Sequence, residues 1–391
     1  MTVSLGIDIL LKGQTRLLKG KRVALLTHGA GVDSHLHATR SLFYNHGAID
    51  LTLLFAPEHG LYGIAQDMEG VLTERDRETG LDVVSLYGRS ATSLKPKVRD
   101  LDRFDCLVCD LQDVGSRYYT FIYTMALCMK ACAEAGKRVI VLDRPNPING
   151  VDVEGPLLKR QFASFVGLYP LPVRHGMTIG ELALYFNETE GFGCDLTVMP
   201  MKGWRRTMYF DETGLCWIPP SPNMPHLNTA ILYPGLCLIE ATQLSEGRGT
   251  TKPFEWVGAP FIEAHKLAVH LNALGLKGAV FSPVSFRPGY QKHQGQVCHG
   301  VQIHVTDRSL FKPYETGLRL IDALYKLYPD SFKWREKAYE FVKDIPAIDL
   351  LTGDAYFMGI VGECGGLDKY IKCCAKESRD FFKKRKKYLL Y

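Results

Sequence analysis

The sequence predicts an α/β fold, with a Rossmann-like parallel-sheet domain at the N-terminus followed by a second α/β (or α+β) domain. The chain of 391 residues is too long for one ordinary hydrophobic core, which favours two domains. Up to about residue 145, short apolar runs alternate with helical patterns, and this repetition favours right-handed crossovers and a parallel sheet. After residue 155 the chain becomes rich in proline, which indicates a change of architecture.

The apolar runs of the first part are rich in Val, Leu and Ile, as strands buried on both faces of a sheet should be. A helix is predicted at 119–135, where Gly136 follows as a helix-terminating residue should. The predicted strands are 22–27, 51–56, 83–86, 106–111 and 138–142. We therefore expect a Rossmann-like domain over residues 1–154.

The second domain is expected over residues 155–391. Thr178 is predicted to cap a helix, with Glu181 at the reciprocal position of a capping box. Further strands are predicted at 196–199, 279–281 and 301–305, and helices at 259–274 and 313–327. The sequence shows no internal repeat and no low-complexity linker, so we expect the two domains to pack closely.

Composition excludes several classes of protein. A hydrophobic content of 46%, a charged content of 23% and a formal charge of +5 are those of a globular chain. The basic run 383–387 is interpreted as a solvated helix end or tail. The sequence shows no basic face with aromatic stacking positions, so nucleic-acid binding is not expected. No stretch is long and apolar enough to span a membrane. The N-terminus does not resemble a signal peptide. We therefore expect a cytoplasmic protein, or an exported one if a leader was trimmed.

The cysteines predict neither a disulfide framework nor a metal site. Their number, 11, is odd, and the chain is long enough to form a core without cross-links. Cys106 and Cys109 lie in an apolar run, where strand geometry points them to opposite faces. Cys373 and Cys374 have no second pair at zinc spacing.

The segment 29–31, Gly-Ala-Gly, superficially resembles a dinucleotide-binding loop. The last glycine of that fingerprint is missing, because position 34 is Ser34, and there is no phosphate-binding lysine. We therefore expect no cofactor.

Polar side chains collect where the predicted strands end. Ligands of open parallel sheets bind beyond the carboxyl ends of the strands, so these residues should share one rim. Turn formation alone would explain Gly, Pro, Asn and Asp there, but not Glu, His, Arg and Gln together. The residues are His28, Glu58, His59, Tyr87, Asp110, Gln112, Asp113, Arg117, Asp143, Arg144 and Asn146.

Three segments of the second domain are also dense in polar residues. They contain His175 (174–176), Asn223 (220–225), and Glu246 with Arg248 (245–251). Glycines beside Glu246 and Arg248 allow backbone to approach a ligand closely, although a salt-bridged loop would explain the same residues.

These residue types suit a sugar ligand. The sequence contains neither the G-x-S-x-G elbow of acyl transfer nor an H-E-x-x-H metal motif. A carboxylic acid with polar partners instead favours hydrolysis of a glycosidic bond, where the leaving oxygen must be protonated.

Several long motifs carry a family resemblance. They are PEHG (57–60), LYG (86–88), DLQDVGSRYYT (110–120), LDRPNP (142–147), VEGP (153–156), FVGLYPLPVRHGMTIGEL (165–182), PSPNMP (220–225) and SEGRGTTKPFE (245–255). With these motifs the chain closely resembles the NamZ-type exo-β-N-acetylmuramidases, a glycoside hydrolase family, up to about residue 330. The resemblance implies removal of terminal N-acetylmuramic acid from the non-reducing end of peptidoglycan fragments. It also implies an active site in a cleft beside the second domain, with the catalytic Glu of PEHG at Glu58.

We therefore expect Glu58 to be the general acid. Its partner stays open between Asp113, Glu246, Asp110 and a tyrosine such as Tyr119, and a spacing of ~5–5.5 Å would favour a retaining route and ~6.5–9.5 Å an inverting one. An arginine should read the lactyl carboxylate of the sugar, and the options are Arg117, Arg144, Arg174 and Arg248. The expected catalytic residues are Glu58, Asp113 and Glu246, and the expected substrate-binding residues are His59, Gln66, Gln112, Arg117, Tyr119, Asp143, Arg144, Asn146, His175, Asn223 and Arg248.

One alternative is a sugar- or nucleotide-binding Rossmann-like protein without glycosidase activity. The expected partner is a peptidoglycan-derived oligosaccharide, with no nucleic acid and no membrane span. The sequence leaves the oligomeric state open.

Overall fold

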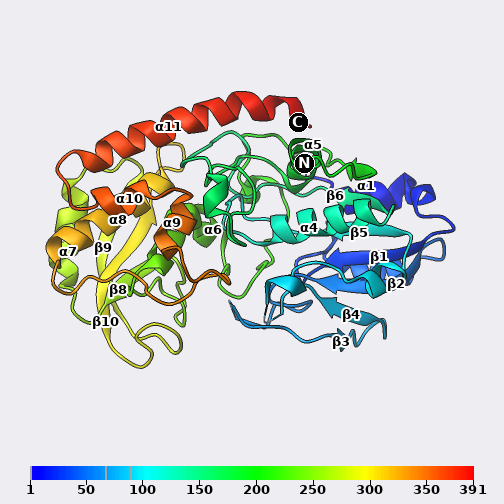
Figure 1. The fold of residues 1–391 in the computed structure, drawn as a ribbon, viewed down its shortest axis with the longest axis horizontal. Helices are drawn as coiled ribbons and strands as arrows, with labels where there is room; N and C mark the ends of the chain where they lie inside the picture. The colour runs from blue at the N-terminus through cyan, green and yellow to red at the C-terminus, as the bar shows by residue number, and fades with distance from the viewer. Residues whose placement is uncertain (1, 67, 89) are drawn as a thin grey trace.

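The computed structural model describes residues 2–66, 68–88 and 90–391. It contains a mostly parallel sheet of seven strands in the first half of the chain and an antiparallel sheet of three strands in the second (Figure 1). The predicted fold class, a Rossmann-like α/β domain with a second α/β domain, is confirmed.

The large sheet has the strand order β3-β4-β2-β1-β5-β6-β7. All neighbours are parallel except the edge strand β3, which pairs antiparallel with β4. The inner strand β5 is buried along its whole length, as its apolar run predicts. The strands are β1 (Arg22–Thr27), β2 (Asp50–Ala56), β3 (Glu74–Arg75), β4 (Asp82–Ser85), β5 (Cys106–Asp110), β6 (Arg138–Leu142) and β7 (Leu196–Met199).

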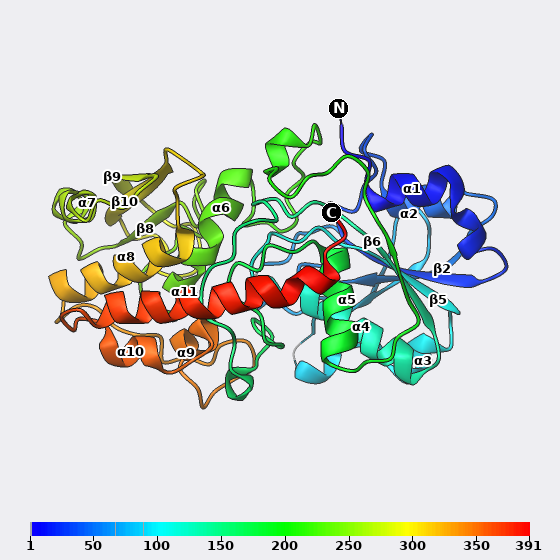
Figure 2. The same cartoon turned by 90° about the horizontal axis from the view of Figure 1, so that it is seen from above.

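Helices cover both faces of this sheet, with α1 and α2 on one side and α3, α4 and α5 on the other (Figure 2). Cys106 packs in the core beneath α1, whereas Cys109 packs in the core beneath α4, so the two lie on opposite faces as expected. Thr178 caps α5 in a capping box with Glu181, and Gly136 follows α4 with φ +64°, both as predicted. The helices are α1 (Gly6–Gly13), α2 (Thr39–Tyr44), α3 (Val98–Leu101), α4 (Phe121–Glu134) and α5 (Ile179–Thr189).

The second half builds on the small sheet, in which β10 lies between β8 and β9. The segment 259–274, predicted as one helix, begins instead at the end of β8 and becomes helical only at Ala264, because 256–259 pairs with β10. The elements are α6 (Leu227–Leu236), β8 (Trp256–Ala259), α7 (Ala264–Ala273), β9 (Ala279–Phe286), β10 (Cys298–Val305), α8 (Pro313–Leu327), α9 (Ala347–Thr352), α10 (Tyr356–Ile360) and α11 (Gly366–Lys384).

The first sheet extends beyond the boundary predicted between residues 154 and 155. The strand at 196–199, expected in the second domain, is β7, which pairs with β6 and adds an edge to the first sheet. The helix α11 begins beside the second half and runs back to α5, so the end of the chain packs against the first half (Figures 1 and 2).

The basic run 383–387 ends α11, as expected, but it is not fully solvated. Arg385 is buried and donates to the carbonyl oxygens of His175, Gly176 and Val151. A guanidinium can be buried there because main-chain acceptors replace its water. None of the described helices is long and apolar enough to cross a membrane.

Candidate active site

The turn that follows β2 places Glu58 at the carboxyl edge of the large sheet. His59 adopts φ +71° and Gly60 φ +78°, so the chain reverses directly after the glutamate. The His59 ring nitrogen Nδ1 lies 2.9 Å from the carbonyl oxygen of Ala65, to which it donates, and this bond closes the loop. Glu58 is thereby held at 5% exposure, inside the protein rather than on its rim.

Two donors hold the Glu58 carboxylate. The hydroxyl of Thr120, at the start of α4, donates to Oε2 at 2.7 Å. The backbone N–H of Met68 donates to Oε1 at 3.3 Å. Because a hydroxyl both donates and accepts, Thr120 can bind Glu58 with or without a proton.

Glu58 lines a cavity between the two halves of the chain. Three carboxylates of the described residues line this cavity, those of Glu58, Glu240 and Glu340, and Arg248 lies among them. The remaining lining residues are His59, Tyr118, Tyr119, Thr120, Val166, Ser221, Asn223, Met224, Tyr233, Phe254 and Tyr339. A larger and more apolar cavity lies between α8 and α11, but Glu154, which lines it, is held by Arg174 at 2.8 Å.

Glu240 is fixed by two strong contacts. Arg248 Nη2 donates to its Oε1 at 2.7 Å, and the Tyr339 hydroxyl donates to its Oε2 at 2.6 Å. Burial favours the neutral acid, but the Arg248 charge and the Tyr339 hydroxyl outweigh it and lower the pKa of Glu240. Glu240 is therefore an ionised carboxylate that orients Arg248 and Tyr339.

Tyr87 lies between the other two carboxylates. Its hydroxyl donates to Glu340 Oε2 at 3.2 Å, and the Glu58 carboxylate lies nearby. Burial and the two carboxylates raise the pKa of Tyr87 far above the usual value, so the phenol keeps its proton. The Tyr87 hydroxyl thus lies beside both carboxylates and binds that of Glu340.

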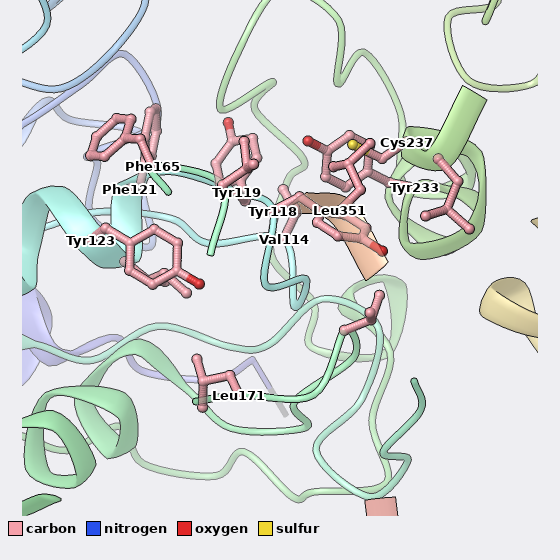
Figure 3. Close-up of a cluster of buried hydrophobic side chains, with 14 of the residues drawn as sticks. Val114, Tyr118, Tyr119, Phe121, Tyr123, Phe165, Leu171, Tyr233, Cys237 and Leu351 are labelled. Carbon is pink, nitrogen blue, oxygen red and sulfur yellow. The ribbon is translucent and has the colours of Figure 1, made fainter. Parts of the chain in front are cut away.

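Aromatic rings form the cavity wall beneath these carboxylates. Tyr119 packs against Phe121 with ring centroids 4.7 Å apart, and Tyr233 meets Tyr118 edge to face at 6.3 Å (Figure 3). Aromatic rings held in place in this way suit the faces of a sugar ring.

The structure brings five of the sequence-predicted residues into the cavity lining. They are Glu58, His59, Tyr119, Asn223 and Arg248. Gln66 lies next to them, because its side-chain oxygen accepts a hydrogen bond from Asn223 Nδ2 at 3.0 Å. Glu246 lies behind Arg248, 3.5 Å from Arg248 Nε and 2.8 Å from Lys292 Nζ.

Asp113 and His175 form a buried pair outside this lining. His175 Nδ1 accepts from the N–H of Met177 at 3.2 Å, so the proton is on Nε2, which lies 3.3 Å from Asp113 Oδ2. The same Asp113 oxygen accepts from the N–H of Gly115 at 2.8 Å. These contacts shape the turn after β5, and the predicted catalytic and binding roles of Asp113 and His175 remain predictions.

Two of the predicted arginines make structural contacts. Arg117 is fully buried and donates to the carbonyl oxygens of Pro156, Leu171 and Leu351, which joins segments of both halves. Arg144 binds Asp110 through two bonds of 2.6 and 2.8 Å at the ends of β6 and β5. Neither lines the cavity of Glu58.

The other predicted polar residues also hold backbone in place. Gln112 Nε2 donates to the carbonyl oxygens of Asp113 and Pro145, and Asn146 Nδ2 donates to that of Met177. His28 links Gln112 to the second half, accepting from its N–H at 3.0 Å while its other ring nitrogen lies 3.2 Å from the Pro220 carbonyl oxygen. Burial lowers the pKa of His28 to about 3, so this link is a neutral imidazole.

Asp143, also predicted to bind substrate, ends β6 inside the first domain. Its carboxylate accepts from Gly180 N at 2.7 Å, Thr178 Oγ1 at 2.8 Å and the Tyr391 hydroxyl at 2.7 Å. Burial and the nearby charge of Glu181 nevertheless raise the pKa of Asp143 to about 7.

This raised pKa predicts a pH-dependent stability. Between about pH 4 and about pH 7 the folded chain retains a proton on Asp143 that the unfolded chain has lost. The free energy of unfolding should therefore fall as pH rises through that window, by on the order of a few kcal/mol. Urea unfolding across the window should give a flatter profile for Asp143→Asn. The exposed Asp195→Asn is the control, and a variant as steep as the wild type would contradict the assignment.

Comparison with known proteins identifies the family. Residues 23–228 match the family model "Exo-beta-N-acetylmuramidase NamZ, N-terminal", and residues 231–391 match the corresponding C-terminal model. The chain belongs to the NamZ family. The two models meet near residue 230, where the chain passes from the large sheet to α6.

Relatives of the NamZ family match over the whole chain. The peptidoglycan beta-N-acetylmuramidase NamZ of Bacillus subtilis is 46% identical over 389 residues, which cover 100% of this chain and 91% of the relative. Two crystal structures of DUF1343 family proteins from Bacteroides fragilis are similar, each over 100% of this chain and 99% of the other. Their TM-scores are 0.88 and 0.77, at 35% and 30% sequence identity.

Sequence reasoning missed part of this NamZ site. Glu240 lies in a 3-10 helix and Glu340 on a turn, and neither follows a predicted strand of the large sheet. Tyr339 and Glu340 also lie beyond about residue 330, where the family motifs are less distinctive. Thr120 ends the motif DLQDVGSRYYT and lies in the first turn of the helix predicted at 119–135, a position that could have suggested contact with Glu58.

Proposed function

We propose that this chain is an exo-acting β-N-acetylmuramidase that removes terminal N-acetylmuramic acid from the non-reducing end of peptidoglycan fragments, with Glu58 as general acid. The observation that carries the proposal is the buried carboxyl of Glu58 in the PEHG segment, inside a carboxylate-lined cavity between the halves of a NamZ-family chain. The name of the Bacillus subtilis relative supports the same substrate class.

The cavity has the chemical groups that this reaction requires. Hydrolysis needs a proton for the leaving oxygen and negative charge near the oxocarbenium-like anomeric carbon. Glu58 supplies the proton in this proposal, and the ionised Glu240 contributes negative charge to the same cavity. The walls formed by Tyr119 and Tyr233 exclude water from the reacting bond.

The test uses two chromogenic substrates that differ in one group. The purified chain should release the chromophore from an aryl β-N-acetylmuramide, and much more slowly from the matching β-N-acetylglucosaminide, which lacks the lactyl ether. Reduced oligosaccharides ending in N-acetylmuramic acid should lose that sugar from the non-reducing end, as mass spectrometry would show. No release from any muramic acid substrate would refute the proposal.

Arg248 is the residue that we propose binds the lactyl carboxylate of N-acetylmuramic acid. Among the four arginines that the sequence nominates, Arg248 lines the cavity, whereas Arg117, Arg144 and Arg174 do not. Glu240 and Glu246 orient its guanidinium, whose planar donors suit a carboxylate bidentately.

Replacing Arg248 by Lys keeps the charge but removes the bidentate geometry. We expect kcat/KM on the β-N-acetylmuramide to fall by about tenfold or more, while kcat/KM on the β-N-acetylglucosaminide changes little. Steady-state kinetics on both substrates measures this selectivity, and the exposed Arg287→Lys serves as the matched control. An equal loss on both substrates would show that Arg248 does not read the lactyl group.

A further inference from the structure

We infer that Glu340 is the second catalytic carboxylate, acting as the nucleophile of a retaining reaction. The inference rests on the proposed function and deepens it. The sequence left the partner of Glu58 open between Asp113, Glu246, Asp110 and a tyrosine such as Tyr119. Asp110 is bound by Arg144, and Tyr119 lines the cavity but carries no carboxylate. In the structure, Asp113 is engaged with His175 and Glu246 with Lys292, and neither lines the cavity of Glu58.

Glu340 reaches the cavity from a tight turn of the second half. Tyr339 and Val342 exchange two backbone hydrogen bonds of 3.0 and 2.9 Å, which leaves Glu340 and Phe341 as the central residues of the turn. Both have positive φ, +45° and +68°, a conformation that asparagine and glycine usually fill. A glutamate and a phenylalanine are strained there, and such strain is typical of positions that serve a site.

The turn buries the carboxylate instead of exposing it. A residue at a turn tip is usually solvated, yet Glu340 is 6% exposed and lines the cavity. The ring of Phe341 packs over Tyr87, with centroids 5.8 Å apart, which holds the tip against the first half. The site is therefore completed by a contact between the two halves.

Tyr87 lies close to both Glu58 and Glu340. Its hydroxyl lies 3.2 Å from Glu340 Oε2, and the Glu58 carboxylate is near enough to raise the pKa of Tyr87. Both carboxylates therefore lie beside one phenol hydroxyl and line the same cavity. This closeness favours the ~5–5.5 Å spacing of retaining glycosidases over the ~6.5–9.5 Å of inverting ones, which leaves room for a water between the acids.

Glu240 fits the nucleophile less well. Both of its oxygens are already engaged at 2.6 to 2.7 Å by Tyr339 and Arg248, so attack by either would break a short contact. Glu240 is instead a positioning residue for Arg248 and for Tyr339, the residue directly before Glu340.

The reaction then proceeds in two balanced steps. In the first, a carboxylate oxygen of Glu340 attacks the anomeric carbon, the bond from that carbon to the leaving oxygen breaks, and Glu58 gives its proton to that oxygen. In the second, water attacks the anomeric carbon, its proton passes to Glu58, and the ester bond to Glu340 breaks. Both carboxyl groups return to their starting states, and the released sugar keeps the β configuration.

The first measurement needs no variant. Proton NMR of the wild-type reaction should show β-N-acetylmuramic acid as the first-formed anomer, before mutarotation. Initial release of the α anomer would overturn the inference while leaving the proposed function intact. A wild type that releases no muramic acid would refute the proposed function, and the inference with it.

The second measurement removes the nucleophile. Glu340→Ala should lower kcat on an aryl β-N-acetylmuramide by about 10³-fold or more, and sodium azide should restore turnover while forming the α-glycosyl azide. A structural role for Glu340 would not produce an inverted azide. Turnover of Glu340→Ala within about tenfold of the wild type, or azide rescue of Glu240→Ala with the α product instead, would overturn the inference.

Two further variants control for folding. Glu336→Ala removes an exposed carboxylate from the same segment and should behave as the wild type. Glu340→Gln keeps the size of the side chain at the turn, and its circular dichroism and thermal midpoint should match the wild type while turnover is lost. Normal turnover by Glu340→Gln would contradict the assignment even if Glu340→Ala does not fold.

Discussion

Replacing Glu58 by Gln is expected to lower kcat on oligosaccharide substrates by about 10²- to 10⁴-fold, the range that a positioned general acid contributes. The amide has nearly the same shape and can still hydrogen-bond the Thr120 hydroxyl, which now lies 2.7 Å from Glu58 Oε2, so the fold should be preserved. What is lost is the proton for the leaving oxygen. Steady-state kinetics of the purified variant on a muramic acid disaccharide measures the effect.

Substrates whose leaving groups differ in pKa distinguish a general acid from a residue that only binds the sugar. An aryl leaving group of low pKa needs little protonation, so Glu58→Gln should lose much less activity on that substrate than on the disaccharide. A residue that only hydrogen-bonds a sugar hydroxyl would lose similar activity on both. The exposed Glu74→Gln, in the same half of the chain, is the matched control. Near-normal kcat on both substrates would remove Glu58 from the acid role.

Replacing Arg144 by Met is expected to destabilise the fold by about 3 to 5 kcal/mol, the usual cost of leaving one partner of a buried ion pair alone. Asp110 has 0% side-chain exposure and would lose two bonds of 2.6 and 2.8 Å, keeping the 2.5 Å contact from Thr39 Oγ1. Urea unfolding followed by circular dichroism would measure the change.

Two further variants test whether the unpaired charge of buried Asp110 causes the loss of stability. The double variant Asp110→Asn, Arg144→Met should recover much of the lost stability, because no charge then remains unpaired. The control Arg22→Met breaks the pair with Asp105, whose side chains are 46% and 40% exposed, and should cost at most about 1 kcal/mol. An Arg144→Met variant of normal stability with a raised KM would instead support the binding role predicted from the sequence.

The first sheet was largely predictable because its inner strands β1, β2, β5 and β6 are buried on both faces. An unbroken apolar run such as 106–109 is typical of such a strand, and the turn residues after each run mark the carboxyl edge. The short strand β7 was assigned to the wrong sheet, because its sequence does not show which edge it joins. The strand β8 was missed, since its four residues pair only with β10.

The site was predictable to a lesser degree. Clustering at strand ends selected Glu58 and His59, which line the cavity, but the same rule also selected Arg117, Arg144 and Asn146, whose polar groups bind carbonyl oxygens or Asp110. A polar residue at a strand end serves either a ligand or the backbone of the neighbouring turn, and both uses favour the same residue types. Contacts in three dimensions are needed to separate them.

The sequence by itself therefore determined the α/β class, the edge of the sheet that carries Glu58, and through its motifs the NamZ resemblance. These features depend on local periodicity and on contiguous segments. The tertiary structure alone decided that Glu240 and Glu340 share the cavity with Glu58, because these residues come from segments far apart in the chain. The partner of the predicted acid is set by how the second half packs on the first, and no spacing within one segment records that contact.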